Sequence, residues 1–115
     1  MRYGTRIEGH ASLKLAVPTA LPSAMRGKVV ELRSLRTEPD HRGEGHATNL
    51  MLATTLEADM HRYFLFLHVK PDEDGPLDEA RLANWYNKFG FTTIQADPLL
   101  MVRPHVGAMM VAGNG

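Results

Sequence analysis

The sequence contains no cysteine among its 115 residues. This absence excludes disulfides, zinc–thiolate sites and a cysteine nucleophile, and it fits a reducing compartment. Thirteen basic and thirteen acidic side chains cancel, so the net charge gives no reason to expect binding to nucleic acid. The N-terminus lacks the apolar segment of a signal peptide, and no run approaches the ~18 apolar residues of a membrane span. We therefore expect a cytoplasmic protein with no membrane partner, for which nucleic acid is a disfavoured partner.

The length and the 43% apolar content fit one globular domain over residues 1–115, with residues 106–115 as a loosely held tail. Apolar residues alternate with polar ones in residues 10–18 and 28–37, which predicts two strands. The continuous apolar run at 63–71 predicts a buried central strand, and residues 91–96 and 99–105 predict two short strands. Residues 18–27 and 72–76, which contain proline and glycine, are predicted to be a loop and a turn.

Two helices are predicted between these strands. In the first, over residues 47–60, one apolar row includes Ala47, Leu50 and Met51, and a second row consists of Leu52, Leu56 and Met60. A helix apolar over so much of its circumference should be well buried. The second helix, over residues 77–90, has acidic residues at its start and Gly90 at its end. Together the elements predict a mixed α/β structure.

Between the second strand and the first helix lies the segment PDHRGEGHA, residues 39–47. A Walker loop is excluded because His46-Ala47 stands where lysine and serine or threonine are needed, and a dinucleotide fingerprint is poorly matched. Successive backbone amides at the start of a helix do favour an anion such as pyrophosphate, and Gly43 and Gly45 permit close approach. From these residues alone, a simple tight turn remains the alternative.

Two motifs resemble those of the GNAT superfamily, the acyl-CoA-dependent N-acyltransferases. RGEGHA is similar to the family signature Gln/Arg-x-x-Gly-x-Gly/Ala, and WYNKFGF, about 40 residues later, resembles its Tyr-x-Lys-x-Gly-Phe segment. The resemblance covers residues 9–105. It implies a GNAT-like α/β fold: a mixed, mostly antiparallel sheet with a central splayed parallel strand pair and two main helices.

The resemblance also implies a site. Main-chain groups of Leu35, Arg36 and Thr37 would pair with the pantetheine arm of acetyl-CoA. The pyrophosphate would lie on the amides of six residues: Arg42, Gly43, Glu44, Gly45, His46 and Ala47. Tyr86 would protonate the departing thiolate, although it could instead be a packing residue.

Glu31 lies at the strand position where some relatives carry a general base, although it could equally be an exposed strand carboxylate. An amine acceptor must lose a proton before it attacks the thioester. The six histidines include no pair at i, i+4 with a glutamate, so we expect no metal site.

The activity implied is transfer of an acetyl group from acetyl-CoA to a primary amine of an unidentified small molecule or protein. The alternative is an acetyl-CoA-binding or interaction domain with little or no turnover. Most relatives carry helices before the first hairpin that wall off the acceptor site, and only about eight residues stand there in this chain. We therefore expect a homodimer, in which a partner subunit could close that side.

Overall fold

A computed structural model describes residues 1–18, 28–72, 75 and 77–108. One six-stranded sheet has the order β1-β2-β3-β4-β6-β5. Its strands are β1 (Gly4–Glu8), β2 (Ala11–Ala16), β3 (Val29–Thr37), β4 (Phe64–His68), β5 (Thr92–Ala96) and β6 (Leu99–Arg103). Two helices, α1 (His46–His61) and α2 (Glu79–Asn87), and a short 3-10 helix, η2 (Pro39–His41), accompany the sheet, and residues 106–108 are also helical.

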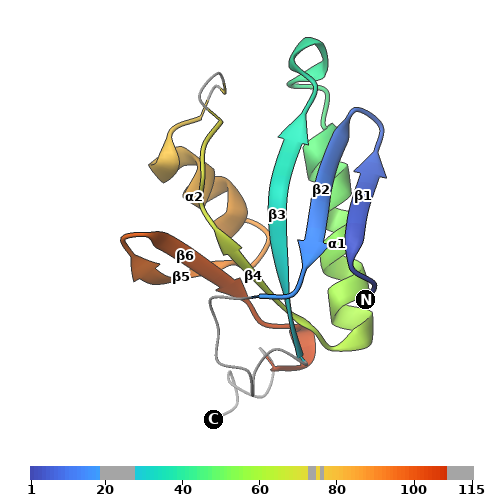
Figure 1. The fold of residues 1–115 in the computed structure, drawn as a ribbon, viewed down its shortest axis with the longest axis vertical. Helices are drawn as coiled ribbons and strands as arrows, with labels where there is room; N and C mark the ends of the chain where they lie inside the picture. Colours follow the sequence, from blue (N-terminus) through green and yellow to red (C-terminus); the bar gives the residue numbers. More distant parts are fainter. Residues whose placement is uncertain (19–27, 73–74, 76, 109–115) are drawn as a thin grey trace.

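The pairing of the strands confirms the expected fold class. Among the described strands β3 and β4 alone run parallel, and the other neighbours are antiparallel. In Figure 1, β3 and β4 lie close together at one end and diverge towards the other, with α1 behind β1 to β3 and α2 beside β4. The sheet therefore has the predicted splayed parallel pair at its centre.

Strand β1 is an element that the apolar pattern did not reveal. It pairs with β2 along its whole length, from Gly4 opposite Leu15 to Glu8 opposite Ala11. Its side chains are mostly exposed, and Ile7 is 70% exposed. An edge strand held by backbone hydrogen bonds needs no buried apolar face, so its sequence carries no strong period-two signal.

Helix α1 is buried on one face only, contrary to the expectation from its two apolar rows. It contacts β1 to β4 through a face that contains Leu50, Met51 and Ala58. The second row is exposed, with Leu52 at 54%, Leu56 at 60% and Met60 at 71%. The prediction of a helix buried around most of its circumference was wrong, because nothing in the described chain packs on the outer face.

An ion pair joins the end of α1 to β6. The Arg103 guanidinium donates to both carboxylate oxygens of Asp59, at 2.8 and 3.0 Å, and also to the Phe89 carbonyl. The side chains of Arg103 and Asp59 are 8% and 19% exposed. The Val106 amide donates to the same carboxylate at 2.9 Å, so the tail that was expected to be loose is held at its first residue.

Some predictions fall wholly or partly outside the described residues. The loop at 18–27 lies outside them except for Pro18, as do residues 73, 74 and 76 of the predicted turn and residues 109–115 of the tail. No helix within the described ranges is long and apolar enough to cross a membrane.

Candidate functional site

The parallel pairing of β3 and β4 stops before either strand ends. Their paired residues are Val29–Phe64, Val30–Leu65 and Glu31–Phe66, whereas β3 continues to Thr37. A groove of about 1030 Å³ opens beyond the last pair, between β3 and the segment that follows β4. One edge of β3 thus stays paired with β2, while no described strand pairs with the other edge from Leu32 to Thr37.

A β-bulge accompanies this divergence. The register between β2 and β3 shifts, because Ser12 pairs with Arg36 while Lys14 pairs with Arg33. The extra residue lies around Ser34, whose φ of +56° is left-handed. Bulges bend a strand and raise its local twist. The bulge therefore directs the second half of β3 away from β4, and no residue type in KVVELRSLRT signalled it.

The loop at residues 42–47, here called the glycine loop, closes one end of the groove. Gly43 and Gly45 have φ of +82° and +86°, and a Cβ added to either would meet no atom within 4 Å. Gly45 is the N-cap of α1, and no side chain caps that helix start. The first amides of α1 therefore remain available for an anion, in a conformation that only glycine adopts without strain.

The predicted cofactor residues lie together, with one exception. All of them except Glu44 line the groove: Leu35, Arg36, Thr37, Arg42, Gly43, Gly45, His46 and Ala47. The exposed Glu44 carboxylate instead contacts His46 Nε2 at 2.8 Å and His41 Nδ1 at 3.1 Å. Hydrogen bonds from His46 and then His41 lower the pKa of Glu44, so its carboxylate remains charged but outside the groove.

Tyr86 reaches the groove from α2. Asp78 caps the start of this helix by accepting from the Arg81 amide at 2.8 Å, and Gly90, with φ of +95°, follows its end. Tyr86 is 6% exposed and packs edge-to-face against Trp85 and Phe91. Burial, assisted by the negative charge of Asp72, raises its pKa to about 12, so the hydroxyl is protonated at neutral pH.

Glu31 occupies the narrow end of the groove. It is 7% exposed, which removes the interpretation of an exposed strand carboxylate. Its carboxylate accepts a hydrogen bond from Arg33 Nε, two residues along the same strand. Glu31, Arg33 and Tyr86 all line the groove, so the two predicted catalytic side chains share one cavity.

The opposite wall includes residues that the sequence analysis did not select. His68, Lys70 and Asp72 line the groove at and after the end of β4. Their positions just beyond a buried strand were the only available signal, since polar residues that follow such a strand lie at the edge of the sheet. Lys70 and Asp72 place a positive and a negative side chain on the side of the groove that faces β3.

Comparison with known proteins rests on structure alone. No family model matches the chain, and no curated protein matches it in sequence. The anti-CRISPR protein AcrVA5 is similar over 89% of this chain and 98% of its own, with a TM-score of 0.67 and 12% identity. A GNAT-family acetyltransferase from Staphylococcus aureus Mu50 is similar over 83% of this chain, with a TM-score of 0.54 and 11% identity.

This chain has the GNAT fold. A third similar structure is N-acetylglutamate synthase from Neisseria gonorrhoeae, complexed with coenzyme A and L-arginine, with a TM-score of 0.56 and 14% identity over 84% of this chain. The present chain spans 59% of the Staphylococcus protein and 22% of the Neisseria protein. At these identities the likeness concerns the GNAT fold, and the activity must be argued from the groove.

Proposed function

We propose that this protein is an N-acetyltransferase that moves the acetyl group of acetyl-CoA directly to a primary amine. The observation that carries the proposal is the single groove that joins the glycine loop and a helix start without a side-chain cap to Tyr86 and Glu31. The first two features suit a diphosphate, and the last two suit proton transfer at a thioester. The GNAT fold of structures described as acetyltransferases supports the same assignment.

Cofactor binding would use main-chain groups throughout. The unpaired edge of β3 at Leu35, Arg36 and Thr37 offers amides and carbonyls to the two amide groups of pantetheine, as an added strand would. The amides of the glycine loop and the dipole of α1 would hold the pyrophosphate. Because these contacts come from the backbone, specificity for acyl-CoA depends on chain geometry more than on particular side chains.

The reaction needs no covalent enzyme intermediate. The neutral amine attacks the thioester carbonyl carbon, a C–N bond forms, the C–S bond breaks, and coenzyme A leaves as a thiolate. The ammonium form of the acceptor first gives a proton to Glu31, directly or through water. The proton lost on forming the amide passes to solvent, and Tyr86 supplies the proton or hydrogen bond that the thiolate requires. Solvent then takes the proton from Glu31 and restores the Tyr86 hydroxyl where its proton has moved.

Tyr86 is suited to donation because its pKa of about 12 keeps the hydroxyl protonated. A thiol in water has a pKa of ~8.5, so complete transfer to a fully hydrated thiolate would be uphill. In the buried site the thiolate is also desolvated, which raises its proton affinity. The hydroxyl therefore acts first as a hydrogen-bond donor to the developing negative charge, and its proton moves to sulfur only to the extent that desolvation brings the pKa of the thiol up to that of the phenol.

One observation favours a second function, an acetyl-CoA-binding domain with little turnover. Glu31 accepts a hydrogen bond from Arg33, so one of its carboxylate oxygens is already engaged within the strand. The two functions differ in acetyl-CoA consumption. An amine panel with thiol detection should show amine-dependent release of coenzyme A by the wild type, reduced in Tyr86→Phe and in Glu31→Gln. Release that both variants leave unchanged would remove these catalytic roles, and saturable binding without release would favour the second function.

A further inference from the structure

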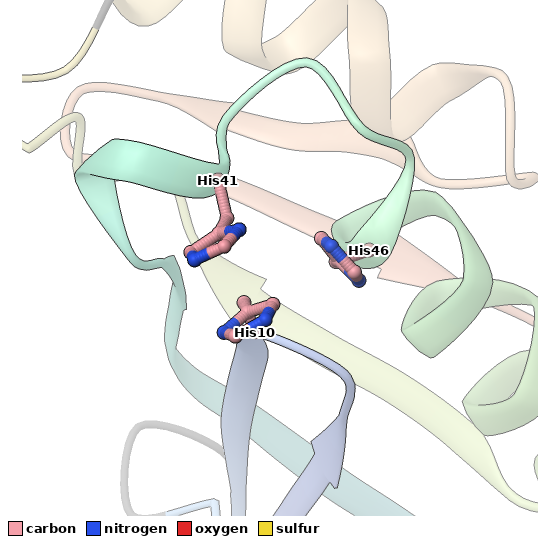
Figure 2. A group of neighbouring side chains, drawn as sticks. All are labelled: His10, His41 and His46. Atoms are coloured by element: carbon pink, nitrogen blue, oxygen red, sulfur yellow. The ribbon is translucent and has the colours of Figure 1, made fainter.

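Three histidines from separate parts of the chain meet beside the glycine loop. His10 comes from the turn between β1 and β2, His41 from η2, and His46 from the start of α1 (Figure 2). One ligand atom from each residue lies within 4.8 Å of the corresponding atoms of the other two. The expectation that the chain has no metal site rested on the spacing of histidines in the sequence. That spacing gives no information about histidines that meet only in the folded chain.

The rings are packed against one another. His10 and His41 stack with centroids 3.4 Å apart, and His46 lies edge-on to His10 at 5.0 Å. The rings of His41 and His46 are also edge-on, with centroids 6.2 Å apart. His46 lies against the hairpin turn: a Cβ added to Gly9 would fall 2.2 Å from His46 Nδ1. These contacts hold the imidazoles of three elements in one group.

Carboxylates support each ring. His10 Nδ1 is 2.7 Å from a Glu38 oxygen, and one Glu44 oxygen contacts both His41 and His46. Metal-ligating histidines are commonly held by a carboxylate on one ring nitrogen, which fixes the tautomer and raises the basicity of the other nitrogen. The pattern is present here for all three rings, which leaves the second nitrogen of each ring as the candidate metal ligand.

We propose that His10, His41 and His46 bind a divalent transition metal of the zinc class. Three imidazoles with nearby carboxylates, and no thiolate, suit Zn²⁺, which takes nitrogen ligands at about 2.0–2.1 Å. In a tetrahedral site the ligand nitrogens lie about 3.3 Å apart, so these atoms must approach one another by up to about 1.5 Å. The partly exposed rings can turn to do so, and the parallel stack of His10 and His41 must open. The bound ion would join the β1–β2 turn to the glycine loop, whatever the groove itself binds.

The test uses the full chain after removal of metal with a chelator. Zn²⁺ alone is titrated in competition with a chromophoric chelator, and Co²⁺ is added separately to record its visible absorption. We expect one equivalent of Zn²⁺ to bind and to raise the melting temperature, since a ligand of the folded state stabilises it. His10→Ala, outside the groove, should weaken Zn²⁺ binding at least about tenfold.

His61→Ala is the matched control, because His61 is exposed at the far end of α1 and belongs to no such group. It should leave Zn²⁺ affinity unchanged. Glu44→Gln provides a second variant and should weaken binding by about 10–100-fold if its carboxylate supports the rings. Melting of each variant without metal confirms that it folds. Equal Zn²⁺ affinity of the wild type and His10→Ala, or an equal loss in His61→Ala, would overturn the site.

Discussion

Glu31 of β3 pairs with Phe66 of β4 at the last position of the parallel ladder, and the groove opens directly beyond this pair. Glu31 therefore lies at the point where the two strands separate. A buried carboxylate at that point can reach the interior of the groove, while the backbone of β3 beyond it remains available to a ligand. This relationship places a charged group and an unpaired strand edge in one cavity.

Gly45→Ala should weaken acetyl-CoA binding by about tenfold or more. The left-handed φ of +86° strains any other residue by about 1–3 kcal/mol, and a Cβ would occupy open space beside the first amides of α1. Calorimetric titration measures the effect. Gly4→Ala is the control, because Gly4 also has a positive φ and open space around its Cβ but lies on β1. A similar loss of affinity in both variants would contradict a specific role for the loop.

Tyr86→Phe should lower kcat by about 10²-fold with little change in the KM for acetyl-CoA, because a proton donor acts when the thiolate forms. Steady-state thiol release provides the measurement. Tyr63→Phe serves as the control, since Tyr63 is a half-buried tyrosine that does not line the groove. A variant whose KM rises while kcat stays constant would identify Tyr86 as a binding residue instead.

The stability of the wild type should fall between pH 10 and pH 12 more than that of Tyr86→Phe. Burial raises the pKa of Tyr86 from 10.0 to about 12. A raised folded-state pKa contributes stability that is complete below the unfolded-state value and is lost as the pH rises through the folded-state value. The extra loss is about 2–3 kcal/mol. Denaturant unfolding of both proteins across this range tests it, and parallel curves would contradict the burial of the hydroxyl.

Asp59→Ala should reduce the free energy of unfolding by about 3–5 kcal/mol, because it leaves the buried Arg103 guanidinium without its carboxylate partner. Burial alone would raise the pKa of Asp59, but hydrogen bonds from Arg103 and Val106 lower it. The stabilisation should therefore be present above the ordinary carboxyl pKa and lost as the pH falls through the lower value in the folded protein.

Urea unfolding at neutral and acidic pH measures this contribution. Asp97→Ala, in the turn between β5 and β6, is a suitable control because Asp97 is exposed and appears in no ion pair of the described chain. It should change stability by less than about 0.5 kcal/mol. A difference between wild type and Asp59→Ala that persists unchanged below the folded-state pKa of Asp59 would argue that lost packing, not charge, causes the effect.

Local sequence patterns were enough to predict much of the fold and part of the candidate site. The glycines at 43 and 45 were visible because a left-handed backbone restricts residue choice, and the helix that carries Tyr86 was bounded by Asp78 and Gly90. The bulge at Ser34 was not visible, since an ordinary residue occupies the left-handed position. The exposure of Leu56 could not be predicted either, because an apolar row does not specify whether another element covers it.

The histidine group likewise could not be predicted from the sequence. His41 and His46 are close in sequence, but His10 reaches them only because β1 and β2 form a hairpin whose turn lies against the start of α1. The strand β1 itself had too few buried side chains to be recognised. A site assembled from a turn, a loop and a helix start depends on tertiary packing, which spacing rules do not encode.

Calorimetric titration of acetyl-CoA into the wild-type protein tests the central claim most directly. The account predicts saturable binding of one acetyl-CoA per chain, weakened by Gly45→Ala and retained in Tyr86→Phe. The absence of binding to the folded wild-type protein, or affinity that Gly45→Ala leaves unchanged, would contradict the assignment of the groove as an acyl-CoA site.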